Sequence, residues 1–126
     1  MNVRRIALLS PLLGLCACMT QQGYDGPRRT SDEVAHISGD LRFNAGIPVS
    51  ALLRQVDGRT LSVSQSGVDV MPGEHSLLVD CVVQETGNTS RYELKVEVYA
   101  GERYRLVPET GTGQRDCVAV HLESVR

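Results

Sequence analysis

The chain has no tryptophan, a single phenylalanine (Phe43) and only four tyrosines among its 126 residues. Its hydrophobic core must therefore come from aliphatic side chains, among which valine is plentiful. Branching at Cβ suits a pleated sheet better than a helix. The shortage of aromatic residues and the supply of valine together favour a domain built from strands.

An excess of basic residues is also missing. Thirteen Lys and Arg stand against fifteen Asp and Glu, which gives a formal net charge of −2. The basic residues are scattered along the chain, whereas a nucleic-acid-binding protein needs a basic face that neutralises phosphates. The composition argues against nucleic acid as a partner, and the length predicts one domain.

The three histidines lack the spacing of a metal site. His36, His75 and His121 have no second His or Cys at the short separations typical of zinc ligands. His75 follows Pro72-Gly73, where its ring is expected to bond the local backbone. We expect His36 and His121 to be ordinary edge or surface residues of strands. The sequence therefore predicts no metal and no cofactor.

Catalytic patterns are equally scarce. Ser62, Ser64 and Ser66 alternate without the G-x-S-x-G elbow that activates a serine. Glu93 and Glu97 share a predicted strand face with cations that would keep both carboxylates ionised, which does not suit a general acid. The loop at 111–113 precedes neither a helix nor a Gly-Lys-Ser/Thr phosphate cradle. We therefore expect no enzyme activity.

The amino terminus has the pattern of a signal peptide. Arg4 and Arg5 supply positive charge, and the apolar stretch 6–17 is much shorter than the roughly 20 residues that span a bilayer. The run Leu15-Cys16-Ala17-Cys18 resembles the bacterial lipobox, with an aliphatic residue at −3 and a small residue at −1. An ordinary secretory signal or an uncleaved anchor is the alternative.

We expect cleavage before Cys18 and lipid attachment to it. Cleavage before Cys16 would place the bulky Leu15 where a small residue is preferred, and would leave an odd thiol. Each buried methylene contributes about 0.8 kcal/mol, so the several acyl chains of a lipobox cysteine hold firmly. Met19, rather than Asp, follows the cysteine. By resemblance to sorted lipoproteins of Gram-negative bacteria, this implies the periplasmic side of the outer membrane.

Residues 19–33 are polar, contain two glycines and a proline, and show no hydrophobic periodicity. This composition predicts a flexible tether. The expected organisation is a signal peptide at 1–17, a lipidated cysteine and tether at 18–33, and one folded domain at 34–126.

The clearest strand is predicted at 91–100, where apolar and charged residues alternate. Its inward face is expected to hold Tyr92, Leu94, Val96, Val98 and Ala100. Gly101-Glu102 then predicts a hairpin that returns the chain along 103–107.

Further turns divide the rest of the domain. Pro72-Gly73 predicts a turn before 76–83, which is apolar on both faces and indicates a central strand. Asp57-Gly58 predicts a hairpin turn that joins 47–56 to 60–63, although 47–56 also fits helical spacing. With a last strand at 117–125, the sequence predicts an all-β, small antiparallel β-sandwich of seven or eight strands.

Cys81 and Cys117 fall in predicted strands. In the oxidising periplasm we expect them to form a disulfide, which would contribute roughly 3–4 kcal/mol for a loop of this length. A redox pair or metal ligands are the alternatives, but there is no C-x-x-C motif.

Three segments resemble a recurring bacterial pattern. They are Val56-Asp57-Gly58, the run Val-Asp-Val-Met-Pro-Gly-Glu-His-Ser-Leu at 68–77, and Val-Tyr-Ala-Gly-Glu-Arg-Tyr-Arg-Leu at 98–106. They are similar to PEGA-like and transthyretin-like β-sandwich modules, in which V-x-V-x-P-G-x-H-x-L and A-G-x-x-Y-x-L mark two hairpins. Pro72-Gly73-Glu74-His75 stands in place of a PEGA tetrad. The resemblance implies a sandwich-type envelope lipoprotein and brings no catalytic residues.

Two functions follow as hypotheses. The first is a membrane-anchored structural or interaction module that docks an envelope protein through an edge strand or the charged face of 91–99. The second is a ligand-binding or hydrolase-inhibitor module that uses a protruding loop at 86–90 or 109–116.

Overall fold

The computed structural model describes residues 20–44, 46–62, 67–113 and 115–125. Within these ranges the chain is all-β and contains no helix that could span a membrane. The strands are β1 (Thr20–Gln22), β2 (Ala35–Ser38), β3 (Asp40–Asn44), β4 (Ile47–Val56), β5 (Arg59–Thr60), β6 (Gly67–Val70), β7 (Gly73–Val83), β8 (Asn88–Val98), β9 (Arg103–Thr110) and β10 (Cys117–Val125).

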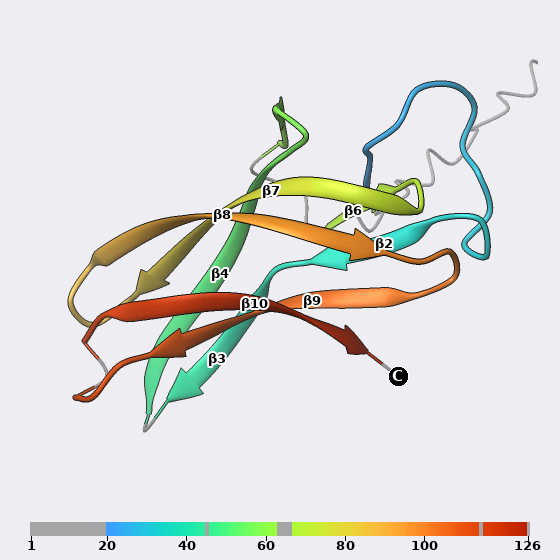
Figure 1. Cartoon of the computed structure of the whole chain (residues 1–126). Helices are drawn as coiled ribbons and strands as arrows, with labels where there is room; N and C mark the ends of the chain where they lie inside the picture. Colours follow the sequence, from blue (N-terminus) through green and yellow to red (C-terminus); the bar gives the residue numbers. More distant parts are fainter. Residues whose placement is uncertain (1–19, 45, 63–66, 114, 126) are drawn as a thin grey trace, which may run out of the picture.

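The strands form two sheets (Figure 1). Sheet A has the order β1-β6-β2-β9-β10, and sheet B has the order β3-β4-β7-β8 with β5 beside β4. The largest fully buried side chains come from both sheets, which pack their inner faces together. They are Ile37, Leu77, Leu106, Val49, Val68, Val70, Val79, Val83, Val98 and Cys81. The predicted small β-sandwich with an aliphatic core is confirmed.

Sheet A is mixed rather than purely antiparallel. β1 pairs with β6, and β2 with β9, in parallel. Parallel neighbours need a long connection between them. For β2 and β9 that connection contains all five strands of sheet B and also β6 of sheet A. The sequence, which displays turns but not distant pairings, did not reveal this.

The longest hairpin is β7–β8, in which Val83 faces Asn88 and Gly73 faces Val98. Along β8 the exposed and inward residues alternate as predicted up to Val98, but the strand ends there, and Ala100, which was expected to face inward, is exposed. β7 lies between β4 and β8; five of its eleven residues are buried, and only Glu74 is fully exposed. The expected alternating strand and the expected central strand are both confirmed.

The hairpin expected at Gly101-Glu102 is wrong, although both of its strands exist. β8 belongs to sheet B and β9 to sheet A, so the turn carries the chain from one sheet to the other. The Gly101 N–H donates to Val34 O at 2.9 Å, which ties the turn to the residue before β2. Pro72-Gly73 likewise crosses from β6 to β7. A turn motif specifies reversal, but not whether the next strand pairs with the last one.

The Asp57-Gly58 turn is confirmed. Both residues have positive φ, 51° and 78°, as a two-residue type I′ hairpin requires. The ambiguous segment 47–56 is a strand, and a bulge between Leu53 and Gln55 shifts its register. This bulge explains the apparent helical spacing, because Leu53 and Val56 face inward although they are three residues apart. Of the strand expected at 60–63, β5 includes Thr60, and residue 63 lies outside the described residues.

The predicted tether is partly folded. β1 adds to the edge of β6, the Gly23 N–H donates to Asp69 O at 2.8 Å, and Tyr24 is only 9% exposed. The folded domain therefore includes residue 20 and does not begin at Val34. A short edge strand needs only backbone hydrogen bonds, so Thr-Gln-Gln shows no apolar alternation. The expected signal peptide and Cys18 lie outside the described residues.

Candidate functional site

The disulfide joins the two sheets. Cys81 of β7 and Cys117 of β10 are bonded, with their Cα atoms 6.2 Å apart, and both are buried. Beside them, the Tyr92 hydroxyl donates to Cys117 O at 2.7 Å. The expected pairing is confirmed. Its buried position between the layers favours a structural role over a redox role.

Asp80 forms the most enclosed ionic cluster. Its side chain is 8% exposed on the outer side of β7, where it accepts hydrogen bonds from Arg91 Nε at 2.8 Å and Arg54 Nε at 3.0 Å. The Arg91 hydrogen bond lowers the pKa of the Asp80 carboxyl, burial opposes this, and Arg54 lowers it further, so the net shift is downward. At neutral pH the carboxylate is ionised, and its hydrogen bonds to the two arginines link β4, β7 and β8.

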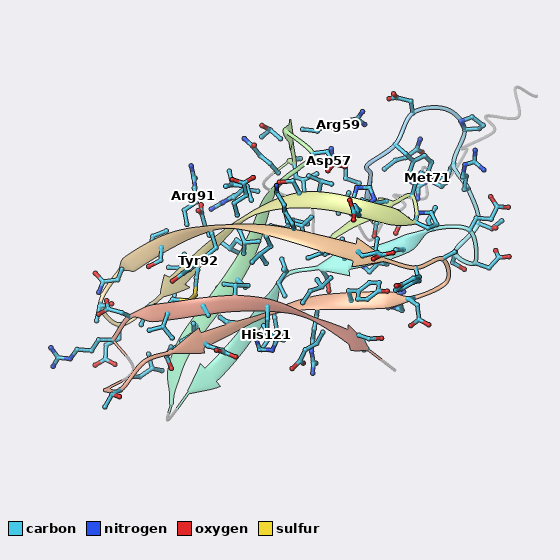
Figure 2. The ribbon with its side chains drawn as sticks, viewed as in Figure 1. Asp57, Arg59, Met71, Arg91, Tyr92 and His121 are labelled. Carbon is cyan, nitrogen blue, oxygen red and sulfur yellow. A yellow bond between two sulfur atoms is a disulfide. The ribbon has the colours of Figure 1, made fainter. Side chains whose placement is uncertain are left out.

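His75 has both ring nitrogens engaged. Nδ1 lies 2.5 Å from Asp57 Oδ2, and Nε2 lies 2.6 Å from Met71 O. Figure 2 shows both partners on the upper side of the molecule: Asp57 lies in the β4–β5 turn, and Met71 lies just before β7. The expected bond to local backbone is confirmed. The carboxylate partner was missed, because it comes from the β4–β5 turn, 18 residues away.

The Asp57 carboxylate also holds the start of β7. The Ser76 N–H donates to its Oδ1 at 2.8 Å. Burial raises the pKa of Asp57, but the hydrogen bonds from His75 and Ser76 outweigh it, so the pKa lies below its ordinary value. A neighbouring hollow of about 420 Å³ is lined by Asp57, Glu74, His75, Ser76, Lys95, Val96 and Glu97.

The other two histidines also contact carboxylates. His36 faces Asp69 across β2–β6 with Nδ1 2.8 Å from Oδ1, and is mostly buried in a strand with neighbours on both sides. The expectation of an edge or surface position is wrong for His36. It is confirmed for His121, which lies half-exposed on the edge strand β10 between Glu109 and Glu123. Over the described ranges, no three His, Cys, Asp or Glu converge as metal ligands.

The sandwich is open along one side, between β8 and β10. A groove of about 380 Å³ runs there, lined by Leu94, Lys95, Val96, Glu97, Tyr104, Val120, His121 and Leu122. β8 is the last strand of sheet B and β10 is the last strand of sheet A, so two strand edges flank the groove. Figures 1 and 2 show both strands on the same side of the molecule, with Tyr92 and His121 nearby.

The charged face expected at 91–99 lies on the outer side of β8. Arg91, Glu93, Lys95 and Glu97 are all exposed there. Glu93 accepts a hydrogen bond from the Ser76 hydroxyl at 3.1 Å. This strand and the groove together form one candidate docking surface, called the β8 edge.

The two loops considered for an inhibitor lie together. The Thr86 hydroxyl donates to Arg115 O at 3.2 Å, and Asn88 Nδ2 donates to Asp116 Oδ1 at 2.8 Å. Each loop is thus held by the other. Of the three alternating serines, Ser62 is exposed two residues after β5, while Ser64 and Ser66 lie outside the described residues.

Comparison of the chain with protein-family models, curated proteins and solved structures found no match.

Proposed function

We propose that this protein is a lipid-anchored β-sandwich of the bacterial envelope that acts by docking protein rather than by catalysis. The anchor is Cys18, the membrane is the outer membrane on its periplasmic side, and the docking surface is the β8 edge. The proposal keeps the PEGA-like and transthyretin-like character suggested by the turn motifs.

The observation that carries the docking role is the free edge of β8 beside an apolar groove. An edge strand presents unpaired backbone donors and acceptors and is a natural template for another strand. Within the described residues, β8 pairs with β7 alone. Leu94 and Val96 are only partly buried along the groove.

The ionic clusters around Asp80 and His75 support a structural role for these side chains. Asp80 is neutralised by Arg54 and Arg91, and His75 is held by Asp57 and the Met71 carbonyl. These groups bond one another across strands and stabilise the sandwich. An inhibitor acting through a protruding loop has less support, because the 86–90 and 109–116 loops are bound to each other.

The anchor would place the sandwich close to the bilayer. Only Met19 separates Cys18 from Thr20, the first residue of β1. A lipidated Cys18 would therefore be followed almost immediately by the edge of sheet A. The β8 edge belongs to the other sheet.

Two measurements test the function. Mass spectrometry of the membrane-purified protein is expected to find a diacylglyceryl-modified Cys18 at the amino terminus. Cys18→Ala is expected to abolish cleavage and lipid attachment. Cys16→Ala is expected to leave both unchanged. A photo-crosslinking amino acid at Lys95 is expected to form a protein adduct in cells, whereas the same group at the exposed Glu85 is not. An unmodified amino terminus would refute the anchor, and equal adducts at both positions would refute the docking surface.

A further inference from the structure

We propose that the partner of the β8 edge is a second copy of this chain, bound by antiparallel pairing of β8 with β8 about a two-fold axis through Leu94. This inference rests on the proposed function, since it names the partner of that surface. The pairing would join two copies of sheet B into one continuous sheet.

The order of charges along β8 carries the inference. In an antiparallel pair centred on Leu94, residues whose numbers sum to twice 94 face each other on the same side of the sheet. Arg91 then faces Glu97 of the second copy, and Glu93 faces Lys95. By symmetry the same two contacts form again, so all four exposed charges of each strand meet an opposite charge.

Other registers do not achieve this. Centring the axis on Glu93 places Glu93 against Glu93 and Arg91 against Lys95. Centring it on Lys95 places Lys95 against Lys95 and Glu93 against Glu97. Like charges directly opposite each other destabilise a strand pair. The charge order therefore selects the Leu94 register among its neighbours.

The charges on β8 are also incompletely matched within one copy. Glu97 lies directly opposite Glu74 across β7–β8, a like-charge pair. In the part of the chain that the structure describes, neither Lys95 nor Glu97 has an ion-pair partner, and the Arg91 side chain is 62% exposed despite its bond to Asp80. A second copy would place its Arg91 opposite Glu97. This positive charge would offset the repulsion between Glu97 and Glu74.

The inner face of β8 fits the same axis. Leu94 would meet Leu94, and Tyr92 would meet Val96, all of which are partly buried and pack against the core. Leu94 and Val96 line the groove together with Val120 and Leu122. Self-pairing would cover this apolar strip, and each buried side chain would add to the stability of the pair.

Charge reversal tests the register with matched variants. The full chain, purified from membranes in detergent, would be compared by analytical ultracentrifugation as wild type, Glu93→Lys, Lys95→Glu and the double variant. Each single change makes both Glu93–Lys95 contacts like-charged and is expected to raise the dimer Kd by about tenfold or more. The double variant exchanges the two charges, restores opposite pairing and is expected to recover the wild-type Kd. Glu85→Lys, with the same charge change in an exposed loop, should leave the Kd unchanged.

Several results would overturn the inference. If the wild-type protein stays monomeric at about 100 µM, self-pairing is refuted, because a dimer with a Kd near 1 µM would be almost fully formed at that concentration. A dimer that ignores both single reversals uses another surface, and a double variant no better than the singles refutes the register. Circular dichroism of each variant separates loss of pairing from loss of fold. A monomer that still forms Lys95 adducts with a different protein would refute self-pairing but keep the proposed docking function. A dimer without lipid on Cys18 would refute the anchor but keep self-pairing.

Discussion

Asp80 of β7 and Arg91 of β8 lie directly opposite each other, and Arg91 donates from Nε to Asp80 Oδ1 at 2.8 Å and from Nη2 to Oδ2 at 3.2 Å. Arg54 of β4 bonds the same carboxylate from the other side. One nearly buried carboxylate thus links three neighbouring strands of sheet B. It also fixes the position of Arg91, the first charge in the proposed self-pairing.

Replacing Asp80 tests this link. Asp80→Asn is expected to lower the free energy of unfolding by about 1–2 kcal/mol at pH 7, since the charge-assisted bonds are lost while both guanidinium groups can reach water. Urea denaturation measures the difference. Glu85→Gln, a change in the exposed loop after β7 and outside the β8 edge, is the control and should have little effect. Equal stability of Asp80→Asn and wild type would contradict a stabilising role.

The contribution of Asp80 should also depend on pH. Its folded pKa lies below the unfolded value, so its stabilising effect is fully present above about pH 4 and is lost as the pH falls through the lowered folded value. The stability gap between wild type and Asp80→Asn is therefore expected to narrow on acidification. Denaturation curves for both proteins between pH 7 and about pH 2 check this. A gap that stays constant over that range would show that the charge of Asp80 is not the cause.

The Asp57 side chain supports a different prediction. Asp57→Ala removes the acceptor of His75 and Ser76 and places alanine at positive φ, so we expect a loss of about 1–2 kcal/mol. Asp57→Asn is the matched control, because asparagine tolerates this φ and keeps an oxygen acceptor. Thermal unfolding should rank wild type, Asn and Ala in that order. If both variants lose the same stability, the charge rather than the turn geometry is what matters.

The inter-sheet disulfide gives a fourth prediction. The double change Cys81→Ala and Cys117→Ala is expected to cost roughly 3–4 kcal/mol, the chain-entropy value for a loop of this length. Reduced wild-type protein should show a comparable loss in the same denaturation assay. Thiol titration of the protein from the envelope should find neither cysteine free. Two free thiols in folded protein would contradict the bond.

The folding of β1 can be followed by hydrogen exchange. The Gly23 N–H is bonded to Asp69 O and should exchange slowly. Gly26, in the exposed segment that follows, provides the comparison and should exchange rapidly. Mass spectrometry or NMR resolves the two regions. Exchange of both amides at the rate of a free peptide would instead support the flexible tether expected from composition.

Sequence patterns determined the local features of this protein. Alternation along 91–98 specified a strand with one charged face, because successive side chains point to opposite sides of a sheet. The run at 76–83, which is apolar on both faces, specified a central strand. Asp57-Gly58 specified the turn between β4 and β5, because both residues tolerate positive φ. The two cysteines in strands indicated their pairing, and the order of charges on β8 was present in the sequence from the start.

Only the tertiary structure decided which strands meet. The turns at Pro72-Gly73 and Gly101-Glu102 turned out to cross between sheets, which depends on where each strand finds its hydrogen-bond partner and not on the turn residues. The same global choice made β1 part of the fold, gave His75 and His36 their carboxylate partners, and left β8 at an edge. Side-chain periodicity is encoded locally, but pairing between distant strands is fixed by burial of the whole core. The charges of β8 could therefore be interpreted as a pairing surface only after the structure placed β8 at the edge of sheet B.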